Sequence, residues 1–125
     1  HEKLAEQLVE EMLLVGEARL TSRMSGTSGF TEDFETRGPW DSKRRSLREL
    51  DLSRRLFRYP LSFLIYSKAF EALPDPAKHF VYNRIEEVLT GDDQSEQFDH
   101  LSRIDRQEIR EILVDTKRDY LSVVR

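Results

Sequence analysis

The chain has 125 residues, of which 38% are hydrophobic and 35% are charged, and its formal net charge at pH 7 is −4. This apolar content is enough for one packed core, so a disordered polyelectrolyte is excluded, and the length suits one domain. Cysteine is absent and no apolar run reaches about 18 residues, so disulfides, thiolate metal sites and a membrane-spanning segment are not expected.

The composition favours helices over strands. The chain has only 5 Gly and 4 Pro, and long charged faces are typical of helices that pack on one side. We predict an all-α fold with one domain over residues 1–125, a small irregular helical bundle of about four to five helices with a long ordered loop. The opening residues HEKLAEQLVEE contain neither a start Met nor a signal region, so we expect the chain to begin inside a longer protein.

The first predicted element is a helix over residues 2–17, because apolar side chains recur there at helical spacing. The stripe consists of Leu4, Leu8, Met12 and Val15, with Val9 and Leu13 beside it. This periodicity ends over residues 18–39, where the glycines of GTSGF predict an ordered but irregular connection. Within that connection, Thr31 is expected to cap a short turn through Phe34.

A basic segment follows the connection. Between Arg37 and Arg58 there are 8 Lys or Arg and 3 acids, a local charge of +5 that leaves −9 for the rest of the chain. Asp51 is expected to cap a short helix that ends near Arg58. Trp40 follows Gly38 and a proline, and we expect it to plug the edge of the core.

The pattern of proline and apolar side chains over residues 60–73 predicts a mostly buried helix. Pro60 suits its first position, and the apolar residues that fit its buried face are Leu61, Leu64, Ile65, Phe70 and Leu73. A buried strand over residues 61–66 is the alternative, but no other segment offers it a pairing partner.

The clearest predicted elements are two helices on either side of the polar loop GDDQSEQFDH. In the first, Asp75 is expected to cap the helix, Pro76 to take its first position and Gly91 to stop it near Leu89. Its apolar face is predicted to contain Ala77, Phe80, Val81, Ile85, Val88 and Leu89.

In the second helix, Ser102 and Asp105 resemble a capping box, and Thr116 is expected to close the helix. Its apolar residues are Ile104, Ile109, Ile112 and Leu113. The two helices suggest an αα-hairpin on which the other helices pack. The tail beyond Thr116 either docks on this body or belongs to an interface.

Residues that could carry chemistry are few. His79 and His100 have no second histidine at helical ligand spacing, and the acidic loop from Asp92 to Asp99 lacks the spacing of a calcium loop. No phosphate-binding loop occurs, and the serines lack the pattern of a nucleophile with its base. We therefore expect no catalytic residue, no bound metal and no cofactor.

The candidate interaction face lies in the basic segment and consists of Trp40, Arg44, Arg45, Arg48, Arg54, Arg55 and Arg58. Its arginines either bind an acidic partner or lie across the acidic helices of their own domain, and we favour the second interpretation. Nucleic-acid binding by the same arginines is a further alternative, although the chain is acidic overall.

Three stretches carry a resemblance over nearly the whole chain: GTSGF, the segment from RGPWDSKRRS to EEVLTG, and LSRIDRQEIREIL. They resemble the C-terminal region of uncharacterised bacterial proteins, some of which look like exported, c-type cytochrome-related chains. The resemblance implies a periplasmic or cell-envelope setting and no assigned activity. The haem-attachment motif CxxCH is absent, and Leu61 stands where related sequences have cysteine, so neither attached haem nor a redox role at that position is implied.

The leading functional hypothesis is a non-catalytic helical module of a larger bacterial protein. It would pack on the rest of its parent chain or on another protein through the basic segment and the apolar tail. One alternative is an accessory domain that shapes a haem or redox site held by upstream residues. The other is nucleic-acid binding through residues 43–58.

Overall fold

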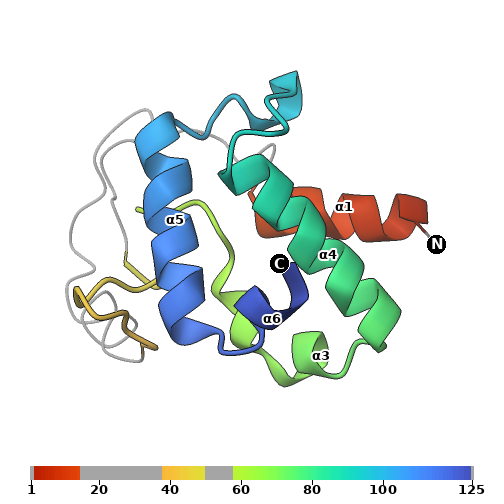
Figure 1. The fold of residues 1–125 in the computed structure, drawn as a ribbon, viewed down its shortest axis with the longest axis horizontal. Coiled ribbons are helices and arrows are strands. Elements are labelled where there is room, and N and C mark those ends of the chain that lie inside the picture. The colour runs from red at the N-terminus through yellow and green to blue at the C-terminus, as the bar shows by residue number, and fades with distance from the viewer. Residues whose placement is uncertain (1, 15–37, 50–57, 125) are drawn as a thin grey trace, which may run out of the picture.

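A computed structural model describes residues 2–14, 38–49 and 58–124 (Figure 1). Within these ranges it contains five α-helices and two 3-10 helices and no strand, which confirms the predicted all-α fold. In chain order the elements are α1 (Glu2–Met12), η1 (Phe63–Tyr66), α3 (Lys68–Glu71), α4 (Asp75–Leu89), η2 (Glu96–Phe98), α5 (Arg103–Thr116) and α6 (Tyr120–Val124).

Helix α4 is the central element, because α1, α5 and α6 all pack against it (Figure 1). Its buried residues are Val81, Tyr82, Ile85, Val88 and Leu89. The predicted end is confirmed, since Gly91 follows with a φ of 87° that favours glycine. The predicted start is one residue off: Pro74 is the capping residue, so Asp75 lies in the first turn, where its charge suits the helix dipole.

Helix α5 begins and ends as predicted. Ser102 Oγ accepts from the backbone N–H of Asp105 at 2.9 Å, and Asp105 Oδ2 accepts from the backbone N–H of Ser102 at 3.1 Å. The prediction that Ile104 joins the buried face is wrong, because its side chain is 67% exposed. Ile104 precedes the buried Ile109 by five positions, which is about 140° around a helix.

Helix α1 is shorter than predicted, because it ends at Met12 and Leu14 has a φ of 58°. Its end is held by two bonds: Ser62 N donates to Met12 O at 2.7 Å, and His100 Nε2 donates to Leu13 O at 2.7 Å. Val9, Met12 and Leu13 are buried. Leu4 was predicted to join the apolar stripe, but its side chain is 69% exposed, so this prediction is wrong.

Residues 60–73 do not form the single helix that was predicted. The backbone forms η1, becomes extended at Ser67, and then forms the short α3. Ser67 Oγ accepts from Phe70 N at 3.1 Å and so caps α3, which explains the break. The strand alternative is also wrong, and Leu64 is 54% exposed rather than buried.

The tail docks on the body, which is one of the two predicted outcomes. Tyr120 of α6 is fully buried, and its ring meets that of Tyr82 edge to face at 5.2 Å between centroids. Tyr120 Oη donates to Glu86 Oε1 at 2.8 Å, and Arg110 Nη2 donates to the other oxygen at 2.8 Å. One carboxylate of α4 thus joins α5 and α6, which fixes the three helices relative to each other.

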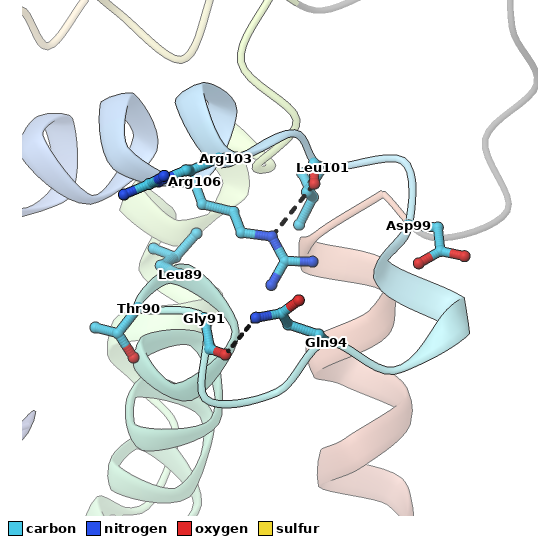
Figure 2. Close-up of a pocket in the computed structure, with 8 residues that line it drawn as sticks. All are labelled: Leu89, Thr90, Gly91, Gln94, Asp99, Leu101, Arg103 and Arg106. Atoms are coloured by element: carbon cyan, nitrogen blue, oxygen red, sulfur yellow. Dashed lines mark hydrogen bonds between the residues drawn. The ribbon is translucent and has the colours of Figure 1, made fainter.

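Arg106 of α5 holds the end of α4 and the loop that follows (Figure 2). Its guanidinium donates to the carbonyls of Val88, Asp93, Phe98 and Leu101 at 2.8 to 3.3 Å. These carbonyls belong to the end of α4 and to the loop that follows, where the regular α-helical hydrogen bonds have ended. Arg106 therefore gives the α4–α5 connection its shape.

Some predicted features lie outside the described residues: GTSGF, the turn from Thr31 to Phe34, and the short helix after Asp51. None of the helices in the described ranges combines the length and apolar character needed to cross a membrane.

Candidate interaction face

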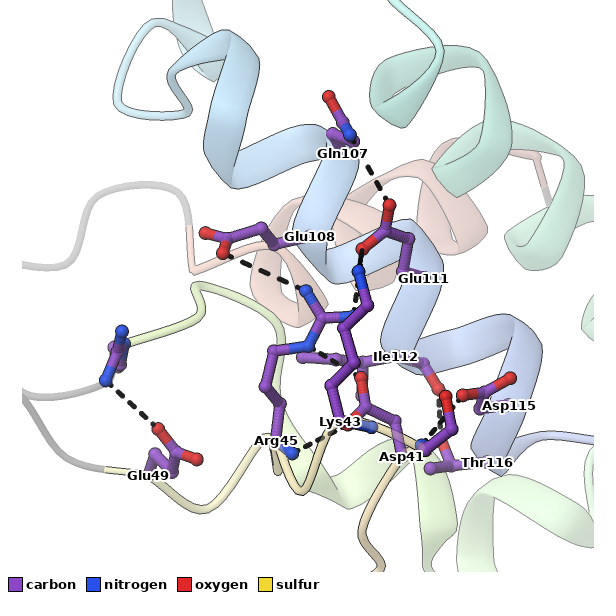
Figure 3. Close-up of polar contacts among 12 residues, drawn as sticks. Asp41, Lys43, Arg45, Glu49, Gln107, Glu108, Glu111, Ile112, Asp115 and Thr116 are labelled. Atoms are coloured by element: carbon purple, nitrogen blue, oxygen red, sulfur yellow. Dashed lines mark hydrogen bonds and ion pairs between the residues drawn. The ribbon is translucent and has the colours of Figure 1, made fainter.

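The loop over residues 38–49 closes on itself around Asp41 (Figure 3). The Asp41 side chain accepts from the backbone N–H groups of Lys43 and Arg45 at 3.0 and 2.6 Å, and from Arg45 Nε at 2.7 Å. Asp41 is only 5% exposed, and a buried carboxylate needs such donors to offset its desolvation. These bonds make the loop an ordered turn.

Arg45 then fixes this turn to α5. Its Nη2 donates to Glu111 Oε1 at 2.9 Å, and its Nη1 lies 3.8 Å from Glu108 Oε2. Figure 3 shows the guanidinium between the carboxylates of Asp41, Glu108 and Glu111. Burial lowers the pKa of Arg45, but the hydrogen bonds to Glu111 and Asp41 outweigh it, so the net shift is upward. The same bond lowers the pKa of Glu111.

A second anchor lies one turn further along α5. The backbone N–H of Ser42 donates to Asp115 Oδ2 at 2.9 Å, and this bond lowers the pKa of Asp115. The loop is thereby held to α5 at two points on the exposed side of the helix. Two such anchors fix the backbone of the loop relative to α5.

Arg48 ties the start of the loop to η1. Its Nε donates to Gly38 O at 2.9 Å, and its guanidinium carbon lies 4.4 Å from the centre of the Phe63 ring. A planar guanidinium can stack on a ring while it donates hydrogen bonds at its edge. The Arg48 side chain is therefore engaged within the chain.

Trp40 is 47% exposed, so the prediction that it plugs the edge of the core is wrong. Its indole lies against the backbone of Gly38 instead: a Cβ added at Gly38 would lie 2.9 Å from Trp40 Nε1. Gly38 also has a φ of 58°, which favours glycine. The indole is thus held against the loop while one side of it faces solvent.

The other predicted residues divide into two groups. Arg44 is exposed and has a φ of 62°, and its backbone N–H donates to Asp41 O at 3.0 Å within the turn. Arg58 has a 61% exposed side chain that lies 3.5 Å from Glu49 and over the Tyr59 ring. Arg54 and Arg55 lie outside the described residues, so their part in the face stays a prediction.

Sequence reasoning missed the acidic side chains that fix the loop, Asp41, Glu111 and Asp115. The spacing of Asp41 and Arg45 could have indicated a local pair. Lys43 belongs to the same surface, since its side chain is 67% exposed and its Nζ lies 3.8 Å from Glu111 Oε1.

The described residues contain no group of three or more His, Asp or Glu side chains that could hold a metal ion. In the acidic loop, the Asp93 carboxylate is engaged within the chain: it accepts from the Ser95 hydroxyl and backbone and from Arg84 Nη2, at 2.5 to 2.9 Å. These bonds lower the pKa of Asp93 to about 2. His79 is exposed, and His100 is bound to the end of α1.

A scan of protein-family models finds no match to this chain, and searches of curated proteins and of solved structures find none either.

Proposed function

We propose that the chain is a non-catalytic helical module that binds the rest of its parent chain or another protein. The binding surface is the Trp40 face, defined as Trp40, Lys43 and Arg44. The observation that carries the proposal is a half-exposed tryptophan on a loop that Asp41 and Arg45 fix to α5. The partner is inferred from this arrangement and from the charge beside it.

Tryptophan and arginine are the side chains that most often dominate binding energy at protein interfaces. A fixed indole loses little conformational freedom on binding, so more of its contact energy contributes to affinity. Lys43 and Arg44 add positive charge beside the indole, which favours an acidic surface and speeds encounter with it. The proposed partner surface is therefore acidic, with an apolar recess for the indole.

The apolar tail is left out of this proposal. Tyr120 is fully buried against α4, and Val123 and Val124 pack against the core from α6. A partner that used these side chains would first have to detach α6 from the body.

The test is affinity capture from the organism that encodes the chain, with the domain immobilised. Wild type is compared with Trp40→Ala and Arg44→Glu, while Arg118→Glu, an exposed arginine outside the face, serves as the control. We expect one partner that is retained by wild type and by Arg118→Glu and lost with the other two variants. Equal capture by all four proteins would contradict the proposal.

Nucleic acid is a less suitable partner for this face, because two of its predicted phosphate ligands are engaged within the chain. Arg45 pairs with Asp41 and Glu111, and Arg48 donates to Gly38 O and stacks on Phe63. A titration with DNA and RNA at low salt, followed by Trp40 fluorescence, separates the two functions. Saturable binding that weakens steeply with salt would favour nucleic acid instead.

A further inference from the structure

A pocket of about 440 Å³ lies between the end of α4 and the start of α5 (Figure 2), away from the residues of the Trp40 face. It is lined by Leu89, Thr90, Gly91, Gln94, Asp99, Leu101, Arg103 and Arg106. We propose that this pocket binds a small organic anion, through a carboxylate or phosphate group that the two arginines recognise and an apolar body that the two leucines contact.

The first step of the argument is the buried charge of Arg106. The residue is 8% exposed, and no carboxylate lies within ion-pair distance of it in the described part of the chain. Four of its five N–H groups donate to backbone carbonyls. Carbonyl groups contribute partial charges only, so the formal positive charge at the pocket is not neutralised.

The second step is a further positive charge at the same end of α5. Arg103 is the first residue of this 14-residue helix, it is exposed, and it has no ion-pair partner among the described residues. The helix dipole adds positive potential at this end, which disfavours arginine and favours an anion. In Figure 2 the Arg103 side chain extends away from the Arg106 guanidinium and Gln94. It is exposed, and an exposed side chain of this length can reorient toward the pocket within nanoseconds.

The third step is the size and composition of the walls. The volume falls within the range of small-molecule sites, which is about 300–1,000 Å³, and exceeds what a lone inorganic ion needs. Leu89 and Leu101 are both buried at 4% exposure and form an apolar part of the lining. Asp99 is the acidic residue of the lining, so the two arginines leave the pocket with a net positive charge.

Benzoate and benzamide are the probes that test this inference, because they share shape and differ in charge. Each is titrated into ¹⁵N-labelled protein while the backbone amides and the Arg106 Nε–H signal are followed by NMR. We expect benzoate to shift the signals of Gly91, Gln94 and Arg106 saturably, with benzamide at least about tenfold weaker. Equal affinities, or no saturable shift with benzoate, would overturn the inference.

Variants at exposed positions complete the test, because such substitutions leave the fold intact and any change in benzoate affinity then reports on the pocket. Arg103→Gln is expected to weaken benzoate binding about threefold or more, and Asp99→Asn to tighten it, because each changes the charge that faces the anion. Arg118→Gln lies outside the pocket and should bind as wild type does. Unchanged benzoate affinity in both Arg103→Gln and Asp99→Asn would show that charge at this pocket does not select the ligand.

Discussion

Arg45 and Glu111 lie 66 positions apart in the chain, and a 2.9 Å hydrogen bond joins Arg45 Nη2 to Glu111 Oε1. The same guanidinium bonds the buried Asp41 at 2.7 Å. One side chain thus connects a loop turn to the surface of α5, and the position of Trp40 depends on that connection.

Replacing Arg45 by Gln is expected to lower the free energy of unfolding by about 1–3 kcal/mol, because the buried Asp41 carboxylate loses its charged partner. Urea denaturation measures this change. Lys43→Gln is the matched control: Lys43 also lies near Glu111 but is exposed, so its loss should cost less than about 0.5 kcal/mol. Equal effects of the two substitutions would contradict the anchoring role of Arg45.

Arg106→Gln is expected to destabilise the domain by about 2–4 kcal/mol, because four carbonyls at the α4 end and in the following loop lose their bonds to the guanidinium. Thermal or urea unfolding detects the loss. Arg103→Gln, on the exposed side of the same turn, should leave stability within about 0.5 kcal/mol of wild type. If Arg106→Gln changed stability as little as Arg103→Gln, the four bonds of Arg106 would not be needed to hold the loop.

Two isoleucines of α5 distinguish the observed buried face from the predicted one. Ile109→Ala should cost about 2–5 kcal/mol, because Ile109 is fully buried and its truncation leaves a cavity. Ile104→Ala should change stability by less than about 0.5 kcal/mol, since that side chain already contacts water. A large loss for Ile104 in a urea titration would mean that the helix is rotated from the orientation described.

The tyrosines predict a loss of stability in alkali. Burial is the largest cause that raises the pKa of Tyr66, to about 12, and it also raises the pKa values of Tyr82 and Tyr120. A phenol whose folded pKa exceeds its unfolded value stabilises the fold below pH 10, and this contribution disappears as the pH rises through the folded pKa.

Absorbance at 295 nm, which reports tyrosinate, should therefore show little ionisation at pH 10 and a rise that coincides with loss of the helical circular dichroism signal. Titration of all four tyrosines near pH 10 in the folded protein would contradict their burial.

The ends of α4 and α5 could be predicted because their signals are local. Gly91 and the Ser102–Asp105 pair act within one turn of backbone, so no tertiary contact is needed to read them. The burial errors have one geometric cause: Leu4 and Ile104 each precede a buried residue by five positions and so lie on another side of the helix. The break at Ser67 was missed because the apolar pattern continues across it.

The candidate site was less predictable for a different reason. Arg44 and Arg45 are neighbours of the same type, yet one is exposed and the other is bonded to α5. Their difference depends on Glu111, which is distant in sequence. The direction of each arginine is therefore a property of the fold and cannot be obtained from composition or local spacing.

Trp40 is the single tryptophan of the chain, so its fluorescence tests the central claim of an exposed indole on a fixed loop most directly. Acrylamide quenching and anisotropy decay are measured on wild type and on Arg45→Gln. We predict an accessible indole in wild type that rotates with the whole domain, and added subnanosecond motion in Arg45→Gln. A wild-type indole that is shielded from acrylamide, or one that moves as freely as in the variant, would contradict the claim.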